Sequence, residues 1–112
     1  THVGRLPNAY LAFDDAALNN GCLGIIRGSH LEGCLPGTDD GSQLGGFFTS
    51  PQAFRASDAV WMEVLAGSLV FFDPYAVHGS GPNRSAKPRR AMIMTYQPPN
   101  HPMLKTGEVC NV

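Results

Sequence analysis

The chain has 112 residues, enough for one small domain, and its 43% hydrophobic and 15% charged residues are typical of globular rather than disordered proteins. The net charge is −1, and basic residues gather only at Arg84, Lys87, Arg89 and Arg90, so no wide basic face for nucleic acid is expected. No apolar run approaches the roughly 18 residues of a membrane span, so no membrane-spanning segment is expected.

The start of the chain and its cysteines indicate how the chain is processed and in which compartment we expect it. The sequence starts at Thr1 without Met and shows no signal peptide, so we expect a fragment or a processed chain, and a cytoplasmic one. Cysteines stand at 22, 34 and 110. An odd, widely spaced set is a poor disulfide framework and a poor zinc site, which favours a reduced, intracellular protein.

Two strands are predicted in the first third of the chain. Residues 8–13 form the first strand, ended by Asp14 and Asp15, and residues 22–27 form the second. The Asn20-Gly21 dipeptide between them is a strong turn signal. Residues 31–58 are rich in Gly, Pro, Ser and Asp, so we expect a long loop with a short helical turn near 51–54.

Four further strands are predicted after the loop. They cover residues 61–64, 69–72, 75–78 and 89–97, and the unbroken apolar run 69–72 favours a strand buried on both faces. Residues 79–88 form a Gly- and Pro-rich loop, and residues 99–112 a peripheral tail. About six strands joined by turns indicate an all-β fold, part of a β-sandwich or jelly roll.

The stretch with the clearest chemical content is His78 to Asn83, followed by Arg89 and Arg90. If the strands on either side of the loop pair, His78 and Arg89 can point into one cavity. A neutral imidazole is a common Fe(II) ligand, and the planar fork of Arg suits a carboxylate. Pattern alone leaves structural or surface roles open, because a lone His at a strand end and a lone Arg after a loop are usually neither ligand nor clamp.

Several segments, in order, resemble the phytanoyl-CoA dioxygenase family of Fe(II)- and 2-oxoglutarate-dependent oxygenases. They are Asn20-Gly21-Cys22-Leu23, Arg27-Gly28-Ser29-His30, the run 67–72, the run 78–83 and Arg89-Arg90-Ala91, within a match over residues 8–97. The resemblance implies a double-stranded β-helix (a cupin-like jelly roll), incomplete because its N-terminal strands are missing. Residues 1–98 would be the C-terminal part of one oxygenase domain, with 31–58 as an insertion or lid.

The resemblance also implies roles for single residues. His78 is expected to be the distal iron ligand, and Arg89 the clamp for the distal carboxylate of 2-oxoglutarate, helped by Ser80. Arg90, on the opposite face, is the weaker candidate. Tyr10 stands where the family often has a Trp that lines the cosubstrate pocket. Asn20-Gly21 and Gly28-Ser29-His30 are expected to be structural signatures rather than ligands.

One departure from the family pattern is large. The family's first two iron ligands form a His-x-Asp motif before the strand of Tyr10, and this sequence has none there. Iron and 2-oxoglutarate would therefore serve the parent protein, which oxidises a small organic or acyl substrate with O2 and releases succinate and CO2. A halogenase with a small residue in place of the Asp, and an inactive jelly-roll binding module, remain alternatives.

Other residues are weaker site candidates. His30-Leu31-Glu32 is formally a His-x-Glu pair, but it lies on the wrong side of the Asn-Gly turn. His2 and His101 are expected on the solvated surface, and Asp14 and Asp15 at a strand end. Phe47, Phe48 and Phe54 either line an apolar pocket or, as we favour, pack the loop onto the core.

Overall fold

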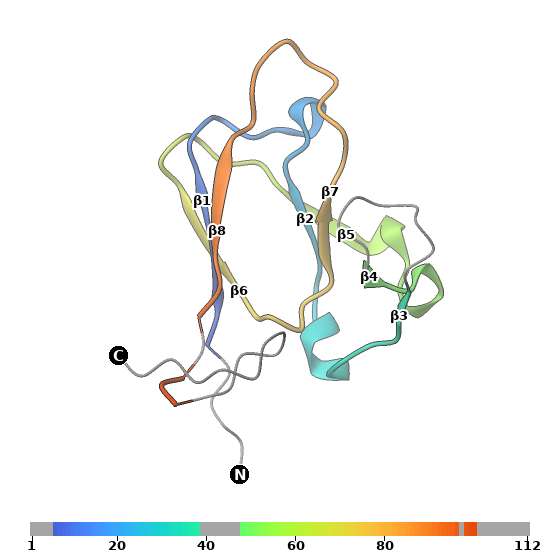
Figure 1. Cartoon of the computed structure of the whole chain (residues 1–112). Coiled ribbons are helices and arrows are strands. Elements are labelled where there is room, and N and C mark those ends of the chain that lie inside the picture. Colours follow the sequence, from blue (N-terminus) through green and yellow to red (C-terminus); the bar gives the residue numbers. More distant parts are fainter. Residues whose placement is uncertain (1–5, 39–47, 97, 101–112) are drawn as a thin grey trace.

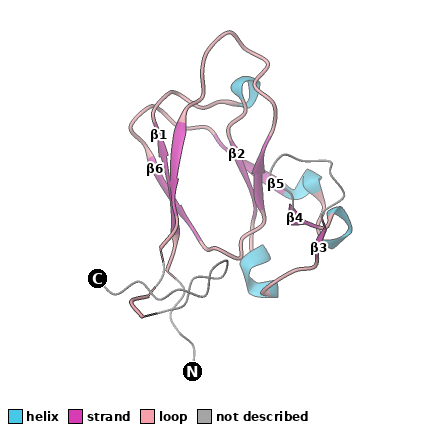
Figure 2. Cartoon of the chain, in the orientation of Figure 1, coloured by secondary structure: helices cyan, strands magenta, loops and turns pink. Residues whose placement is uncertain are grey.

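The structure is a computed structural model that describes residues 6–38, 48–96 and 98–100. It is all-β apart from single 3-10 turns (Figures 1 and 2). The six longer strands are β1 (Asn8–Ala12), β2 (Leu23–Ile26), β5 (Ala59–Met62), β6 (Leu69–Phe72), β7 (His78–Ser80) and β8 (Ala91–Met94).

These six strands form two antiparallel sheets with the orders β6-β1-β8 and β5-β2-β7. The sheets face each other, and their inner faces make the core (Figure 1). Tyr10 and Ala12 of β1 and Phe72 of β6 meet Leu23 of the second sheet in one buried cluster. Directly paired residues share a face, so register identifies the other inward side chains.

Strand β6 alternates between buried and exposed side chains. Phe72 is 6% exposed, whereas Leu69 and Phe71 are 47% and 59% exposed. The prediction of a strand buried on both faces is therefore wrong. An apolar run does not reveal whether a second layer covers the outer face of its sheet.

The strand predicted at 75–78 is also wrong, since β7 begins only at His78. Asp73 and Pro74 instead open a turn, in which the Ala76 N–H donates to the Asp73 carbonyl at 2.9 Å. The Asp73 carboxylate accepts a second bond from the Tyr75 N–H at 2.8 Å. An Asp that bonds the backbone two residues on favours a turn over an extended strand.

The predicted long loop contains short regular pieces. A two-strand hairpin joins β3 (Gly37–Thr38) to β4 (Phe48–Thr49), and 3-10 turns η2 (Ser29–Glu32), η3 (Pro51–Ala53) and η4 (Ala56–Asp58) flank it. The helical turn predicted near 51–54 is confirmed by η3. These pieces lie beside β5 and β7 (Figure 1).

Strand ends differ by a few residues from the prediction. The strand predicted at 61–64 is β5, Ala59–Met62, and Val64 makes an isolated bridge with Ala16. The strand predicted at 89–97 is β8, Ala91–Met94. Most of the predicted tail, 101–112, lies outside the described residues.

Candidate functional site

His78 opens β7 with its side chain on the inner face of the sheet. It pairs with Ile25, which packs against the core cluster, and its ring centroid lies 4.7 Å from that of Phe72. His78 Nδ1 is 2.8 Å from the Ala76 carbonyl oxygen. A carbonyl only accepts, so Nδ1 donates to it, which leaves Nε2 as the ring nitrogen that can bind a metal.

Arg89 and Ser80 approach each other from opposite sheets. Strands β7 and β8 do not pair, contrary to the arrangement considered from sequence, because β7 pairs with β2 and β8 with β1. Arg89 Nη2 lies 3.4 Å from Ser80 Oγ across the interior, a long hydrogen bond. Arg89 Nε is buried and has no partner within the described part of the chain. An unpaired guanidinium donor inside the fold is suited to a carboxylate ligand.

Tyr10 lies on the inner face of β1, between β6 and β8. It is 3% exposed and pairs with Val70 on one side and Ile93 on the other. Its hydroxyl is buried without a partner among the described residues. Tyr10 thus brings an unpaired donor to the interior that holds the Arg89 Nε.

Asn8 is a further candidate site residue, which the sequence pattern did not single out. It is 8% exposed, shares the face of Tyr10, and its Oδ1 lacks a partner in the described chain. The available signal was its alternation with Tyr10 and Ala12 on a strand, which places a polar side chain on the apolar face.

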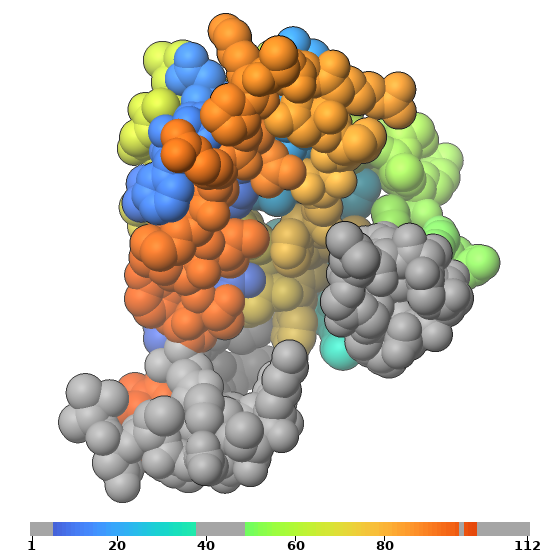
Figure 3. Space-filling model, turned by 45° about the horizontal axis from the view of Figure 1, so that its top comes forward, coloured from blue at the N-terminus to red at the C-terminus, as the bar shows by residue number. Residues whose placement is uncertain are grey.

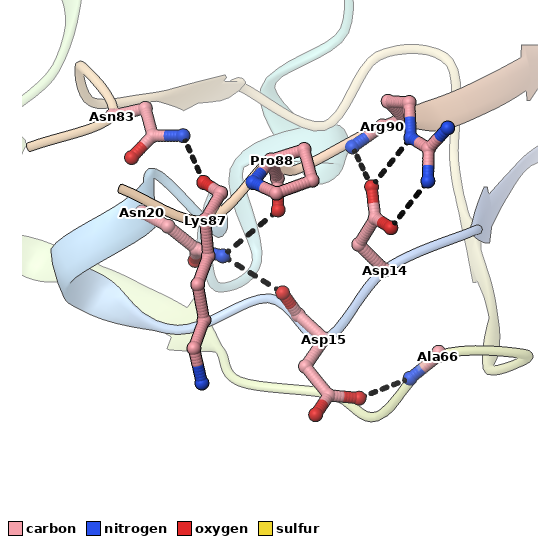
Figure 4. Close-up of polar contacts among 8 residues, drawn as sticks. All are labelled: Asp14, Asp15, Asn20, Ala66, Asn83, Lys87, Pro88 and Arg90. Atoms are coloured by element: carbon pink, nitrogen blue, oxygen red, sulfur yellow. Dashed lines mark hydrogen bonds and ion pairs between the residues drawn. The ribbon is translucent and has the colours of Figure 1, made fainter. Parts of the chain in front are cut away.

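Arg90 is held on the outside by Asp14, which the sequence analysis treated only as a strand end. The Asp14 carboxylate accepts bonds from the Arg90 backbone N–H at 2.7 Å, Nε at 3.0 Å and Nη2 at 2.9 Å (Figure 4). These hydrogen bonds from the side chain and backbone of Arg90 lower the pKa of Asp14 from 3.8 to about 2. Arg89, one residue earlier, instead reaches Ser80 with its Nη2.

Ser29 fixes the approach to His78. Its buried hydroxyl donates to the Ile26 carbonyl at 2.7 Å and accepts from the Val77 N–H at 2.8 Å. The Ile26 N–H in turn donates to the Val77 carbonyl at 2.9 Å. Both backbone groups of Val77, the residue just before His78, are thus hydrogen-bonded. The Gly-Ser-His segment, which contains Ser29, therefore has a structural role.

Asn20 and Gly21 fix the approach to Ser80 and Arg89. Asn20 Nδ2 donates to the Asp15 carbonyl at 2.8 Å and to the Pro88 carbonyl at 3.4 Å, just before Arg89 (Figure 4). Gly21 has φ +87°, and a Cβ there would lie 2.5 Å from the carbonyl oxygen of Gly81, just after Ser80. The Asn-Gly turn therefore supports both ends of the loop between β7 and β8, which covers the upper end of the molecule (Figure 3).

The interior is open along β7 and β8, which are edge strands of their sheets within the described residues. His78 and Ser80 face inward yet are exposed, and inward-facing Ile93 is 54% exposed. A cavity of about 390 Å³ adjoins His78, lined among others by Cys34, Leu35, Thr49, Pro74 and Tyr75. This cavity therefore lies between the long loop and the turn that leads into His78.

A second cavity, of about 280 Å³, lies largely on the outer face of the β5-β2-β7 sheet. Trp61 and Phe54 line it with Ile26, and the Trp61 ring lies over Gly24, where a Cβ would come within 2.7 Å of the ring. Phe54 therefore borders a pocket, which is the first of the two alternatives that we considered for the phenylalanines of the loop. Phe47 and the side chain of Phe48 lie outside the described residues.

The remaining candidates do not join His78 in a metal site. Over residues 6–38, 48–96 and 98–100, no group of three or more His, Cys, Asp or Glu side chains is placed to hold a metal, so His30 and Glu32 complete no triad. His2, His101 and Cys110 are not among the described residues. Cys22 is buried and Cys34 exposed, and both are free thiols.

No helix in the described part of the chain is long and apolar enough to span a membrane.

Comparison with known proteins connects this geometry to a family. The sequence model of the phytanoyl-CoA dioxygenase (PhyH) family matches residues 1–91. The chain is 34% identical over 92 residues to the Dictyostelium discoideum homolog of phytanoyl-CoA dioxygenase domain-containing protein 1, covering 78% of this chain and 33% of the relative. It is 34% identical over 88 residues to human peroxisomal phytanoyl-CoA dioxygenase, covering 75% of this chain and 26% of the relative.

A solved structure shares the fold. The crystal structure of EvdO2 from Micromonospora carbonacea var. aurantiaca, complexed with 2-oxoglutarate, superposes with a TM-score of 0.69 and 27% identity, over 78% of this chain and 36% of that one. The chain spans about a third of the length of the relatives that it matches. With the family model matched over most of its residues, the chain belongs to the phytanoyl-CoA dioxygenase family, whose members are related to the Fe(II)- and 2-oxoglutarate-dependent oxygenases.

Proposed function

We propose that this chain supplies the distal iron ligand and the cosubstrate clamp of a Fe(II)- and 2-oxoglutarate-dependent dioxygenase. The observation that carries the proposal is the contact of Arg89, just before β8, with Ser80 of β7, two residues from His78 on the same inner face. The whole protein would have a double-stranded β-helix. Further strands would pair with the edges of β7 and β8, where inward-facing side chains are now exposed.

The residues present suit 2-oxoglutarate. The partnerless Arg89 Nε lies inside the fold beside the Ser80 hydroxyl, and together they can bind both oxygens of a carboxylate. The partnerless Tyr10 hydroxyl lies in the same interior and can donate to the same ligand. A buried N–H left unpaired is costly, so a carboxylate that accepts from Arg89 Nε would relieve a cost that the fold already carries.

The residues present suit iron only in part. His78 offers Nε2, oriented by its Nδ1 bond to Ala76 and by packing against Phe72. The other two protein ligands of a two-histidine, one-carboxylate site would come from parts of the protein beyond the described residues. When bound, iron and 2-oxoglutarate activate O2, so that one oxygen atom enters the substrate and the other enters succinate as CO2 leaves.

The rest of the chemistry belongs to the chain's own side chains. Arg89 and Ser80 hold the distal carboxylate and so align the opposite end of the cosubstrate with His78. The apolar core cluster around Tyr10, Leu23 and Phe72 would exclude water from the part of the interior where the cosubstrate binds. The 390 Å³ cavity beside His78 supports the long loop as the wall against which a small organic or acyl substrate binds.

The test uses the polypeptide as its gene encodes it, including any residues upstream of Thr1. We expect Arg89→Met to weaken 2-oxoglutarate binding about a hundredfold, measured by calorimetry with Mn²⁺ in place of iron, since a buried charge pair is lost. His78→Ala should abolish metal-dependent binding and succinate formation. Arg84→Met, which removes an exposed positive charge, is the control and should bind normally. Equal affinity in the Arg89 and Arg84 variants would contradict the proposal.

A further inference from the structure

Asn8 is a buried polar residue whose place in the fold is not explained by the fold itself. It is 8% exposed, and its Oδ1 is buried without a hydrogen-bond partner in the described part of the chain. Burying an amide oxygen unpaired costs free energy that an apolar side chain at the same position would avoid. A ligand group that pairs with the amide would account for its presence.

The strand register places Asn8 at the His78 end of the interior. Asn8 pairs with Phe72, so the two side chains share a face, and the Phe72 ring lies 4.7 Å from the His78 ring. At the other end of β1, Ala12 pairs with Ala91, next to the segment that carries Arg89. Asn8 and the Arg89 segment therefore lie toward opposite ends of β1, roughly 13 Å apart along the strand.

Three buried polar atoms without a hydrogen-bond partner among the described residues are spaced along the direction of β1. Arg89 Nε lies at one end, the Tyr10 hydroxyl in the middle and Asn8 Oδ1 at the His78 end. The long Arg89 side chain and a five-carbon dicarboxylate can together span the distance between the two ends. Rotating the Asn8 amide by half a turn presents either its carbonyl or its NH2 group to such a ligand.

We infer that Asn8 binds the keto-acid end of 2-oxoglutarate, with its NH2 group donating to the carboxylate next to the keto carbon. Arg89 and Ser80 bind the distal carboxylate, and Asn8 sets the orientation of the other end beside His78. This inference rests on the proposed function, since it takes 2-oxoglutarate as the ligand. It adds a second anchoring point, contributed by β1.

The experiment compares two ligands on the protein as its gene encodes it, with Mn²⁺ present in place of iron. 2-Oxoglutarate carries both carboxylates, whereas pentanoate keeps the five-carbon chain with a single carboxylate for Arg89. We expect Asn8→Ala to weaken 2-oxoglutarate binding roughly ten- to hundredfold, the value of a charge-assisted hydrogen bond, and to leave pentanoate binding unchanged. Asn8→Asp should weaken 2-oxoglutarate binding further, because two carboxylates then repel. Arg89→Met should weaken both ligands.

Melting without ligand separates a binding role from a structural one. Asn8→Ala removes a partnerless buried atom, so the melting temperature of the ligand-free protein should stay the same or rise. A lower melting temperature with unchanged 2-oxoglutarate affinity would make Asn8 structural and overturn the inference. If Asn8→Ala binds 2-oxoglutarate normally while Arg89→Met does not, only this inference fails. If both variants bind normally, the proposed function fails with it.

Discussion

Two neighbouring arginines, Arg89 and Arg90, have different environments in this chain, and their hydrogen bonds distinguish them. Arg89 and Arg90 are adjacent, but Asp14 holds Arg90 outward through three bonds, while Arg89 keeps a partnerless Nε inside. A difference of one position along the chain therefore separates a residue in a surface ion pair from a candidate ligand of a carboxylate.

The Asp14–Arg90 pair should make stability depend on acid. The pKa of Asp14 is about 2, below its ordinary 3.8, because of the hydrogen bonds from Arg90. A lowered carboxyl pKa contributes stability that is present above about pH 4 and lost as pH falls toward 2. We expect Asp14→Asn to remove this part of the acid dependence in urea unfolding midpoints measured between pH 2 and 6.

The control for that prediction is Asp58→Asn. Asp58 pairs with Arg55 at 3.2 Å, but their side chains are 48% and 82% exposed, and exposed pairs contribute little. A wild-type profile in the Asp58 variant and a flattened one in the Asp14 variant is the expected outcome. Identical profiles for wild type and Asp14→Asn between pH 2 and 4 would refute the argument.

Ser29 should stabilise the segment before His78 through one hydroxyl. Ser29→Ala leaves the buried Val77 N–H without its acceptor, which costs about 1–3 kcal/mol of unfolding free energy. Metal binding should also weaken, since Val77 precedes His78. Chemical denaturation and Mn²⁺ titration measure the two effects, with Ser57→Ala, at an exposed position, as the control. Loss of stability with full metal affinity would leave Ser29 a packing residue alone.

At the scale of elements, the turn before β2 and the loop between β7 and β8 form one unit. Asn20 donates to Pro88, the Arg84 N–H donates to the Asn19 carbonyl at 2.9 Å, and Gly21 abuts Gly81. The loop carries Ser80 at one end and Arg89 at the other. The turn therefore sets the spacing of the two residues that we assign to the distal carboxylate.

Gly21 and Gly67 allow this contact to be tested with a matched pair of substitutions. Both have positive φ, +87° and +85°, so a Cβ strains the backbone equally, but only at Gly21 does it meet an atom within 4 Å. We expect Gly21→Ala to destabilise by about 1–3 kcal/mol more than Gly67→Ala, and to weaken 2-oxoglutarate binding. Equal effects of the two variants on unfolding free energy and affinity would show that the contact with Gly81 is unimportant.

At the scale of the whole molecule, the outer face of the β6-β1-β8 sheet is apolar. Phe71, Ala9 and Met94 form one row across the three strands, and Leu69, Leu11 and Met92 form the next. Phe71, Leu69 and Met92 are 59%, 47% and 44% exposed. An apolar patch on a sheet with exposed edges favours association.

A chain of these 112 residues should therefore self-associate through that face. We expect Phe71→Glu to lower the mean mass in sedimentation equilibrium while leaving the thermal melt nearly unchanged, because the side chain is largely exposed. Leu31→Glu, at a position 79% exposed in η2 and away from the sheet, is the matched control and should associate like the wild type. A monomeric wild-type chain would contradict this prediction.

The sequence by itself determined the all-β class, the approximate places of five of the six longer strands and the identities of His78, Ser80, Arg89 and Tyr10 as candidates. Local periodicity, turn residues and ordered family motifs carry that information, because each depends on neighbours along the chain. The same local signals misplaced the strand at 75–78, since they did not weigh the turn that Asp73 makes with Tyr75.

Only the tertiary structure decided which strands are neighbours and which polar groups lack partners. β7 and β8 follow each other in sequence but belong to opposite sheets, so Arg89 reaches Ser80 across the interior rather than along a ladder. Whether the outer side of Phe71 is covered, and whether Asn8 finds a partner, depends on residues far away in the chain. Burial and hydrogen-bond satisfaction are properties of the whole fold, which no local pattern contains.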